Sequence, residues 1–477
     1  MKRAAVAVLA AGMTACTVGP NPGRPALTVP PAYREQPPQS FKEQEGWKQA
    51  QPADAQIRPD WWQIFGDPEL NDLEAQVDPA NQTLKAAEAR FRQARALIQL
   101  NRSGLFPTVG TAPSVSTNRL SQNAPLGSHA GDYAQYLLPV DVSYELDVWG
   151  RIRRSIEAAR EEARASAADL ETIRLSVHAE LALDYFELRS LDAQQQLLNQ
   201  TLVTYQKALE LTGHRFDGGL SSRAEVAQAR TQLETTRSQA IGVAVDRANF
   251  EHAIALLTGQ TPESLTLAAR PLTGTPPPVP VGVPGQLLER RPDIASAERL
   301  VADANQRVGI ARAAFFPSLL ITAEGGFESS HLVDWLSWPS RFWALGPTAA
   351  ETLFDAGRRR AAADAATAGY DETVANYRQS TLAAFQQVED ALSTLRVLEQ
   401  QAAAQRVAVE AARQSLDLSM NRYKGGLVTY LEVVAAQTAA LQNESTEVDL
   451  LRRRMIATVL LIKALGGGWD VSRLPAT

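Results

Sequence analysis

The sequence of 477 residues is poor in cysteine, histidine and aromatic residues. Its single cysteine, Cys16, excludes an intramolecular disulfide and a metal cluster built from cysteines. Its five histidines do not have the spacing of a zinc-binding helix, and neither a Gly-x-Ser-x-Gly nucleophile motif nor a phosphate-binding glycine loop is present. These absences argue against an enzyme, a metal site and a bound cofactor.

Long apolar runs and basic stripes are also missing. No stretch of about eighteen apolar residues occurs, which argues against a transmembrane helix. The net charge of -6, without a basic stripe interleaved with aromatic residues, argues against a nucleic-acid partner. Aromatic residues make up only 6% of the chain, whereas alanine is abundant. This composition suits close helix packing better than a large globular core.

The one cysteine lies in an N-terminal segment that resembles the signal peptide of a bacterial lipoprotein. A basic start and small apolar residues precede Met13-Thr14-Ala15-Cys16, which predicts cleavage after residue 15 and lipidation of Cys16. Acyl chains on this cysteine would anchor the protein in a membrane. Thr17 stands where an acidic residue would signal retention in the inner membrane, so we expect the outer membrane. The alternative is an ordinary signal peptide with a chance cysteine.

Residues Arg151 to Thr212 contain neither glycine nor proline and repeat apolar or small residues every three or four positions. This spacing predicts one very long helix. About 60 residues at a rise of about 1.5 Å make a rod on the order of 90 Å long. After Asp217-Gly218-Gly219, the run from Leu220 to Thr258 is expected to fold back as an antiparallel partner. The sequence therefore predicts a long helical hairpin.

The same pattern returns about 207 positions later, which indicates a tandem duplication. Residues 215–220 (Arg-Phe-Asp-Gly-Gly-Leu) are matched by residues 422–427 (Arg-Tyr-Lys-Gly-Gly-Leu). A second rod is therefore expected from Arg358 to Lys424, with a return helix from Val428 to Leu465.

Segments rich in proline flank and separate the two repeats. They predict an extended tether before the first repeat and an extended linker between the repeats. Trp61 and Trp62 predict a hydrophobic cluster that fixes the tether to the rods, with a carbohydrate-binding platform as the alternative. The expected segments are a signal peptide (1–15), a lipidated tether (16–60), a first repeat (61–270), a linker (271–285), a second repeat (286–466) and a tail (467–477).

Each repeat also contains segments with the period of a β-strand. Residues 140–148 alternate apolar with acidic or polar side chains, which predicts a strand with one apolar face. Residues 105–122 are the expected partner strand, after which a loop is expected at 123–132. Residues 316–328 and 338–354 hold the same places in the second repeat. About nine or ten such residues can cross a bilayer as a tilted strand.

Strands that span a membrane must close into a barrel, because an open edge leaves backbone groups unpaired in lipid. Four strands from one chain cannot close, whereas three chains supply about twelve. We therefore expect a homotrimer in contact with membrane lipid. The alternative is that the strands form an ordinary soluble sandwich.

Several further motifs occur in a fixed order from Cys16 to about Leu465, and they are the following: the lipobox, the segment from Trp61-Trp62 to Leu70, Arg291-Pro292-Asp293-Ile294 with Ala297-Glu298, the Phe-Pro pairs at 106–107 and 316–317, and the two Gly-Gly-Leu tips. In this order and spacing they resemble the outer-membrane efflux proteins of the TolC-like family. Within that family they are most similar to the NodT-type lipoproteins, which serve resistance-nodulation-division pumps.

The resemblance implies a mainly α-helical fold with a membrane β-barrel. Duplicated long helical hairpins plus four strands per chain would trimerise into a twelve-stranded barrel and an α-helical tunnel. The implied protein is the outer-membrane channel of a tripartite efflux pump, which passively conducts small molecules from a periplasmic adaptor and an inner-membrane pump to the outside. One alternative with the same fold is an exit duct for type I protein secretion. Another is a lipid-anchored periplasmic coiled-coil scaffold without a pore.

The same resemblance assigns expected roles to residues at the hairpin tips. Tyr423 would hold the closed gate, and Glu432 would contribute to an acidic ring in the lumen, with Glu225 at the corresponding place in the first repeat. Because like charges near one axis attract cations, we hypothesise that Glu432 makes the pore prefer cations. The alternatives are solvated glutamates and a tyrosine that only caps its hairpin. The residues expected to meet the adaptor are Arg215, Gly218, Gly219, Leu220, Arg422, Gly425, Gly426 and Leu427.

Two positions depart from the family pattern. In the segment 434–437 (Val-Ala-Ala-Gln), Ala435 stands where an acid often occurs, and Val428 stands where some members carry an arginine. A double acidic ring and an arginine latch are therefore not expected.

Overall fold

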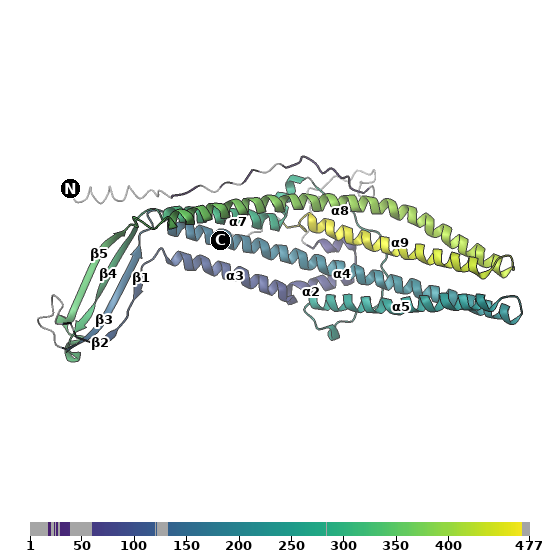
Figure 1. Cartoon of the computed structure of the whole chain (residues 1–477), viewed down its shortest axis with the longest axis horizontal. Helices are drawn as coiled ribbons and strands as arrows, with labels where there is room; N and C mark the ends of the chain where they lie inside the picture. The colour runs from purple at the N-terminus through teal and green to yellow at the C-terminus, as the bar shows by residue number, and fades with distance from the viewer. Residues whose placement is uncertain are drawn as a thin grey trace.

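The structure is a computed structural model that describes residues 18–20, 23, 25–26, 29–38, 60–119, 121, 132–282 and 284–469. The predicted signal peptide, Cys16 and the end of the tail lie outside the described residues. Figure 1 shows long helices that lie side by side along one axis, with a sheet at one end. Among the described helices, none combines the length and the apolar character needed to cross a membrane.

Two helical hairpins of equal length form the body of the molecule. In the first, α4 (Arg151–Asp217) has 67 residues and α5 (Arg223–Leu257) has 35. In the second, α8 (Arg358–Lys424) and α9 (Tyr430–Ala464) have the same two lengths. These hairpins confirm the predicted rods and their duplication, and the four helices begin and end within a few residues of the expected positions.

Shorter helices form a second layer against the rods. In the first repeat, α2 (Pro68–Ala80) and α3 (Gln82–Ser103) precede the sheet. In the second repeat, α6 (Leu287–Arg290) and α7 (Pro292–Ala313) hold the same place. Helix α3 packs along α4, whereas α7 packs against both α4 and α8. The two repeats are therefore joined along their length and not only through the linker.

Antiparallel strands form one sheet at the end of the rods (Figure 1). Strand β3 (Asp132–Glu145) pairs with β1 (Thr108–Gly110) and β2 (Ser114–Arg119). On its other side, β3 pairs with β4 (Ser318–Ser329), which pairs in turn with β5 (Arg341–Ala350). Strands β1 and β2 share one position beside β3, so the described sheet has four strand positions, as the sequence predicts.

The sheet corrects three of the expected strand ranges. Of the segment 338–354, only Arg341–Ala350 forms β5, because residues 338–340 form a short helix. The segment 105–122 forms two short strands instead of one, because Pro113 lies between them and cannot donate a hydrogen bond to a ladder. Strand β3 begins at Asp132 and ends at Glu145, whereas the alternation predicted a strand over 140–148. Polar and aromatic side chains at the start of β3 interrupt the alternation of apolar and polar residues, so the alternation did not indicate this part of the strand. The expected loop lies outside the described residues, except that Asp132 belongs to β3.

The register sorts the side chains of the sheet onto two different faces. Val142 lies opposite Ala323, which lies opposite Leu345, so these apolar side chains share one face. On the other face, Asp141 lies opposite Glu324. Side chains alternate across a strand, and the predicted division into an apolar face and an acidic face is confirmed.

The main core lies midway along the rods and includes the short helix η2 (Trp61–Phe65). Trp61 is buried and packs edge-on against Trp62, whose ring stacks on His178 with 4.5 Å between the ring centres. Tyr33 of the tether packs against the same core. The predicted hydrophobic cluster is therefore confirmed, and the alternative of a ligand platform at Trp61 and Trp62 stays a prediction.

The proline-rich linker and the start of the tail pack against the rods. Residues 271–282 run without helix or strand, but Val279 among them is buried in the main core. At the start of the tail, Trp469 is buried against Ala168 and Ala295. The linker therefore contributes to the core instead of only spanning the two repeats.

Candidate functional site

Each hairpin reverses direction through the same tight turn, in the first tip (residues 215–222) and the second tip (residues 422–429). In the first tip, the backbone N–H of Leu220 donates to the carbonyl of Arg215 at 2.7 Å, and the equivalent bond in the second tip measures 2.9 Å. The second glycine of each Gly-Gly pair has positive φ, 76° and 75°. These are the marks of a Schellman turn, in which glycine takes the left-handed position without steric cost.

The side chain of Arg215 connects the first tip to the second. Its Nη1 donates to the backbone carbonyl of Lys424 at 3.1 Å. Its guanidinium carbon lies 4.8 Å from the centre of the Tyr423 ring, which is within the range of a cation–π contact worth about 0.5–1 kcal/mol at a partly exposed site. Arg215 thus joins two hairpins through a contact between residues that are 209 positions apart in the sequence.

Tyr423 is the buried centre of this junction. Its side chain is 1% exposed and packs edge-on against Tyr430, with 5.3 Å between the ring centres. Ala208, Ala229 and Val433 complete a small apolar cluster around the two rings. Among the described residues, the hydroxyl of Tyr423 has no hydrogen-bond partner. The packing of the ring, and not its hydroxyl, therefore binds Tyr423 to both hairpins.

Glu225 connects the hairpins a second time. Its Oε1 accepts a hydrogen bond from the backbone N–H of Tyr430 at 3.2 Å, and its Oε2 accepts from the hydroxyl of Ser221. Tyr430 is the first residue of α9, and the side chain of Thr429 does not cap this helix. Glu225 therefore supplies an acceptor for an N–H group that the helix leaves unpaired. Partial burial raises the pKa of Glu225, but the hydrogen bonds from Ser221 and Tyr430 outweigh it and lower the pKa below 4.5.

Glu432, the duplicate of Glu225, faces the surroundings. Half of its side chain is exposed, and it pairs with Arg422 of its own hairpin at 3.6 Å. An exposed pair of this kind contributes only about 0–1 kcal/mol. The two predicted acidic residues therefore differ. Glu225 binds the other hairpin, whereas Glu432 contacts only its own hairpin and is half exposed.

The ends of both tips expose apolar side chains. Leu220 is 72% exposed and Leu427 is 75% exposed. Gly218 and Gly425 lie just before the turns with negative φ, so another residue could take their backbone conformation. Each tip thus presents one exposed leucine to its surroundings.

The structure brings some of the predicted site residues together and leaves others apart. Arg215, Tyr423 and Glu225 meet in one junction, whereas Glu432 lies outside it. Tyr430 was not predicted, although an aromatic residue directly after the second tip was a visible signal. In the first repeat, Arg223 stands at its position.

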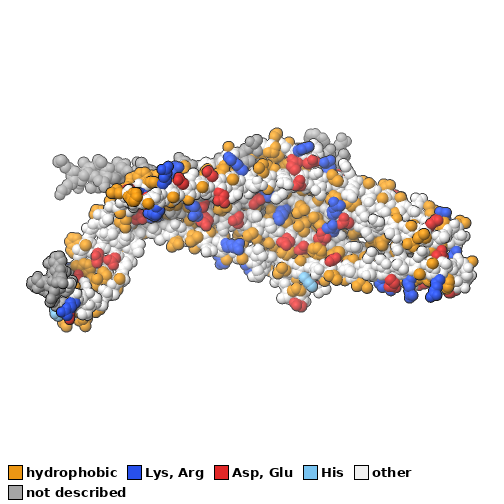
Figure 2. Space-filling model, viewed as in Figure 1, with side chains coloured by type: hydrophobic (Ala, Val, Ile, Leu, Met, Phe, Trp, Pro, Cys, Tyr) orange, Lys and Arg blue, Asp and Glu red, His pale blue; other side chains and the backbone are white. Residues whose placement is uncertain are grey.

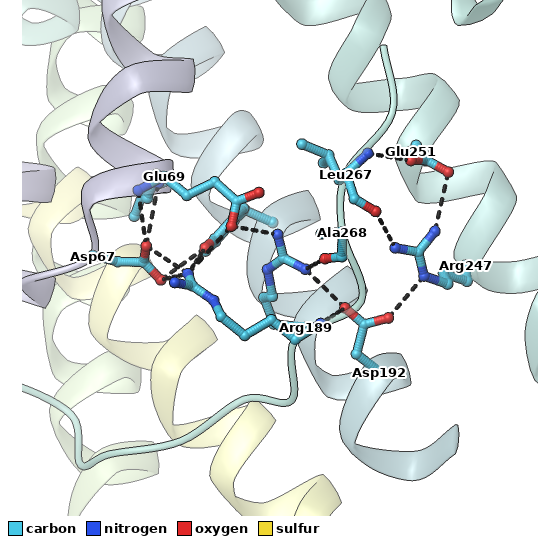
Figure 3. A network of polar contacts seen from close by, with 11 residues as sticks. Asp67, Glu69, Arg189, Asp192, Arg247, Glu251, Leu267 and Ala268 are labelled. Atoms are coloured by element: carbon cyan, nitrogen blue, oxygen red, sulfur yellow. Dashed lines mark hydrogen bonds and ion pairs between the residues drawn. The ribbon is translucent and has the colours of Figure 1, made fainter. Parts of the chain in front are cut away.

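A network of buried ion pairs fixes the first hairpin midway along α4 (Figure 3). Arg189 is buried and contacts Asp192 at 2.8 Å and Glu69 at 2.7 Å. Asp192 also pairs with Arg247 of α5 at 2.7 Å, and Arg247 donates to the carbonyl of Leu267 at 2.7 Å. No sequence pattern indicated this network, because its members come from α2, α4, α5 and the segment that follows α5.

The profile of the outer membrane efflux protein family matches residues 76–260 and 283–467. The chain belongs to the outer membrane efflux protein family. It is 31% identical over 474 residues to the toluene efflux pump outer membrane protein TtgF of Pseudomonas putida, covering 98% of each chain. It is 30% identical over 469 residues to the cation efflux system protein CusC of Escherichia coli, covering 97% of this chain and 98% of CusC.

A solved structure supports the same assignment. The outer-membrane channel OprN superposes with a TM-score of 0.87 at 29% identity, over 95% of this chain and 100% of OprN. As a member of the outer membrane efflux protein family, the chain is an outer-membrane channel of an efflux pump, with its helical tunnel in the periplasm. The family consists of conduits and not of enzymes. The predicted fold class, function and location are confirmed.

Proposed function

We propose that three copies of this chain form one continuous duct. Four strand positions per copy would close into a twelve-stranded barrel in the outer membrane, and the hairpins would form an α-helical tunnel across the periplasm. The sheet supports this proposal because β5 lies at one edge and β1 and β2 lie beside β3 at the other. In lipid, such edges need a neighbouring strand. The apolar face of the sheet would then meet the hydrocarbon.

We also propose the partners of the duct. The exposed Leu220 and Leu427 at the tips would contact a periplasmic adaptor, which connects the duct to a resistance-nodulation-division pump in the inner membrane. A lipid on Cys16 would anchor each copy. The cargo would be small toxic molecules chosen by the pump, because TtgF is named for toluene and CusC for cations although the two share one architecture with this chain.

The junction around Tyr423 is the single observation that supports a role in gating. A tunnel that ends in hairpins can open only if the hairpins of each copy separate or tilt. The contacts of Arg215 with Lys424 and of Glu225 with Tyr430 oppose that movement, and the ring of Tyr423 fills the space between the hairpins. We therefore propose that the tunnel is closed at rest and that this junction is the part of the gate contributed by one copy.

Conductance in a planar bilayer tests the channel and the gate together. The wild-type protein should give small or rare openings, and Tyr423→Ala should give large ones, because it removes the ring that joins the hairpins. Tyr423→Phe should behave like the wild type, since the hydroxyl has no partner among the described residues. Phe216→Ala is the matched control in the first tip, where the equivalent ring is 43% exposed, and it should change little.

Two outcomes would contradict the proposal. A well-folded, heat-sensitive trimer that conducts in no form would contradict the duct. A Tyr423→Ala protein that opens no more than the wild type would leave the duct intact and remove the gate from this junction.

A further inference from the structure

Both long helices begin with arginines, at the place where the sheet meets the rods. Helix α4 starts with residues 151–154 (Arg-Ile-Arg-Arg) and α8 with residues 358–360 (Arg-Arg-Arg), and neither first turn contains an acid. The N-terminus of a helix carries partial positive charge and favours acidic side chains. Three arginines at each of these ends therefore need negative charge from elsewhere.

In the first repeat, the chain supplies this charge itself. Arg151 pairs with Glu145 at 2.6 Å, and Arg153 pairs with Asp147 at 3.0 Å. The carboxylate of Asp147 also accepts from the backbone N–H of Arg153 at 2.9 Å. The third arginine, Arg154, is buried. Helix α4 therefore starts with its exposed charges balanced.

In the second repeat, only the middle arginine is balanced. Arg359 pairs with Asp355 at 2.8 Å and with Glu351 at 3.4 Å. Arg358 and Arg360 are exposed, and their side chains make no ion pair or hydrogen bond with a described residue. The duplicated position thus carries two unbalanced cations where the first repeat carries two ion pairs.

Apolar side chains lie next to these cations. Leu353 is 92% exposed and Phe354 is 86% exposed, just before α8. In the same turn, Ala356 has a φ of 52°, a left-handed conformation that is costly for a residue with a Cβ. Figure 2 shows apolar and basic side chains gathered where the sheet joins the helices. A strained turn thus presents two large apolar side chains beside two unpaired arginines.

The start of the tether indicates the level of the membrane surface. The N–H of Val18 donates to the carbonyl of Trp149 at 3.4 Å, and Trp149 stacks on Phe316 at the base of the sheet. Two residues of chain reach at most about 7 Å, so acyl chains on Cys16 would enter the membrane close to this level. The sheet, with its apolar face, lies on one side of this level, and the long helices lie on the other side. The headgroups of the periplasmic leaflet would then surround the start of α8.

We propose that Arg358 and Arg360, together with Leu353 and Phe354, form a binding surface for anionic phospholipid headgroups in the periplasmic leaflet of the outer membrane. The inference rests on the proposed membrane position of the sheet. Guanidinium groups match phosphate oxygens in charge and geometry, and the two apolar side chains can enter the acyl region. The lipid phosphates supply the negative charge that carboxylates supply in the first repeat.

The test uses the full-length trimer in nanodiscs of phosphatidylcholine, with or without phosphatidylglycerol. Lipid retained after detergent washing is counted by mass spectrometry. The wild type should retain phosphatidylglycerol in preference to phosphatidylcholine, and Arg358→Gln with Arg360→Gln should lower the preference by about fivefold per arginine. Arg358→Lys with Arg360→Lys should keep most of it. The matched control, Arg90→Gln with Arg92→Gln on α3, removes the same charge away from the junction and should change nothing.

Three outcomes would overturn the proposal. The first is a wild-type protein without preference for phosphatidylglycerol, and the second is a preference that survives both glutamine substitutions. The third is dissociation of the glutamine variant in phosphatidylcholine alone, which would assign the arginines to contacts between copies. A wild type that conducts in phosphatidylcholine but has no lipid preference would leave the channel standing and remove only the lipid site.

Discussion

The two hairpins have equal lengths and equal turns, yet different contacts hold them in place. Arg189 of the first hairpin is 2% exposed and lies in a buried ion network. Its duplicate, Arg396, is 38% exposed and pairs with Glu35 of the tether at 2.6 Å. The backbone of Glu35 is bound as well, since its N–H donates to Glu389 of α8 at 2.8 Å. The first hairpin is thus fixed from inside the repeat, and the second by a segment of chain laid over it.

The duplicated charged residues at the two tips also have different partners. Arg215 and Glu225 of the first tip reach across to the second hairpin, whereas their duplicates Arg422 and Glu432 pair with each other. The two repeats therefore share the turn and the positions of the charges, but not the partners of those charges. The charged side chains of the first tip make contacts between the hairpins, whereas those of the second tip do not.

Among the substitutions that test this difference between the hairpins, Arg189→Ala should lower the free energy of unfolding the most. The substitution leaves Asp192, whose side chain is 2% exposed, with one cation fewer, and breaking a buried pair costs about 3–5 kcal/mol. Arg396→Ala removes only a partly exposed pair and should cost about 0–1 kcal/mol. Urea unfolding in detergent, followed by circular dichroism, measures both. Equal losses would show that burial does not distinguish the duplicated arginines.

A buried titratable pair marks a second difference between the repeats. Nδ1 of His178 lies 2.6 Å from Oε2 of Glu74, and both side chains are almost fully buried. Burial lowers the pKa of His178, but hydrogen bonds to Asp78 and Glu74 raise it to about 9. Burial raises the pKa of Glu74 to about 7. Phe385 stands at the duplicated position of His178 and packs against the same core.

This pair predicts that the protein loses stability as the pH rises. The folded pKa of His178 lies above its ordinary value of 6.5, so its contribution is complete below pH 6.5 and is lost as the pH passes 9. Its loss is on the order of 3 kcal/mol. The contribution of Glu74 is lost between its ordinary pKa of 4.5 and about 7.

The double substitution His178→Phe with Glu74→Leu places the residue of the second repeat at position 178, removes the buried pair and should flatten the pH dependence. Replacing a buried ion pair by apolar side chains is often neutral or stabilising. Free energies of unfolding measured at pH 6.5 and above pH 9 provide the readout. A variant that loses as much stability as the wild type would show that other groups set the pH dependence.

The parts of the fold that were predicted from the sequence depend on local signals. The Gly-Gly pairs end both long helices, and a helical period without breakers fills the rods, so each boundary could be read from a few neighbouring residues. Pro113 was just as visible, but its effect on the ladder required the position of β3. The roles of the charged residues were not predictable, because Glu225 and Glu432 stand in equivalent sequence positions and differ only in what folds against them.

A smaller effect is expected from Glu225→Gln in the first tip. The amide keeps one acceptor for Tyr430 but loses the charge, so the contact should weaken by about 1 kcal/mol and spontaneous openings should increase about fivefold. In the wild type, the folded pKa of Glu225 is lowered. Its contribution is therefore complete above pH 4.5 and is lost as the pH falls through the folded pKa. Single-channel recordings at neutral and acidic pH measure the openings, and the variant should lack the acid-induced increase.

Glu432→Gln is the matched substitution in the second tip, and it should affect a different quantity. Its exposed pair with Arg422 contributes little to holding the hairpins, so the frequency of openings should stay the same. Three copies near one axis would attract cations, and the permeability ratio of cations to anions should therefore decrease. An unchanged reversal potential would reject the acidic-ring hypothesis for Glu432. An increase in openings equal to that of Glu225→Gln would instead show that the second tip also supplies contacts, and the asymmetry between the tips would be lost.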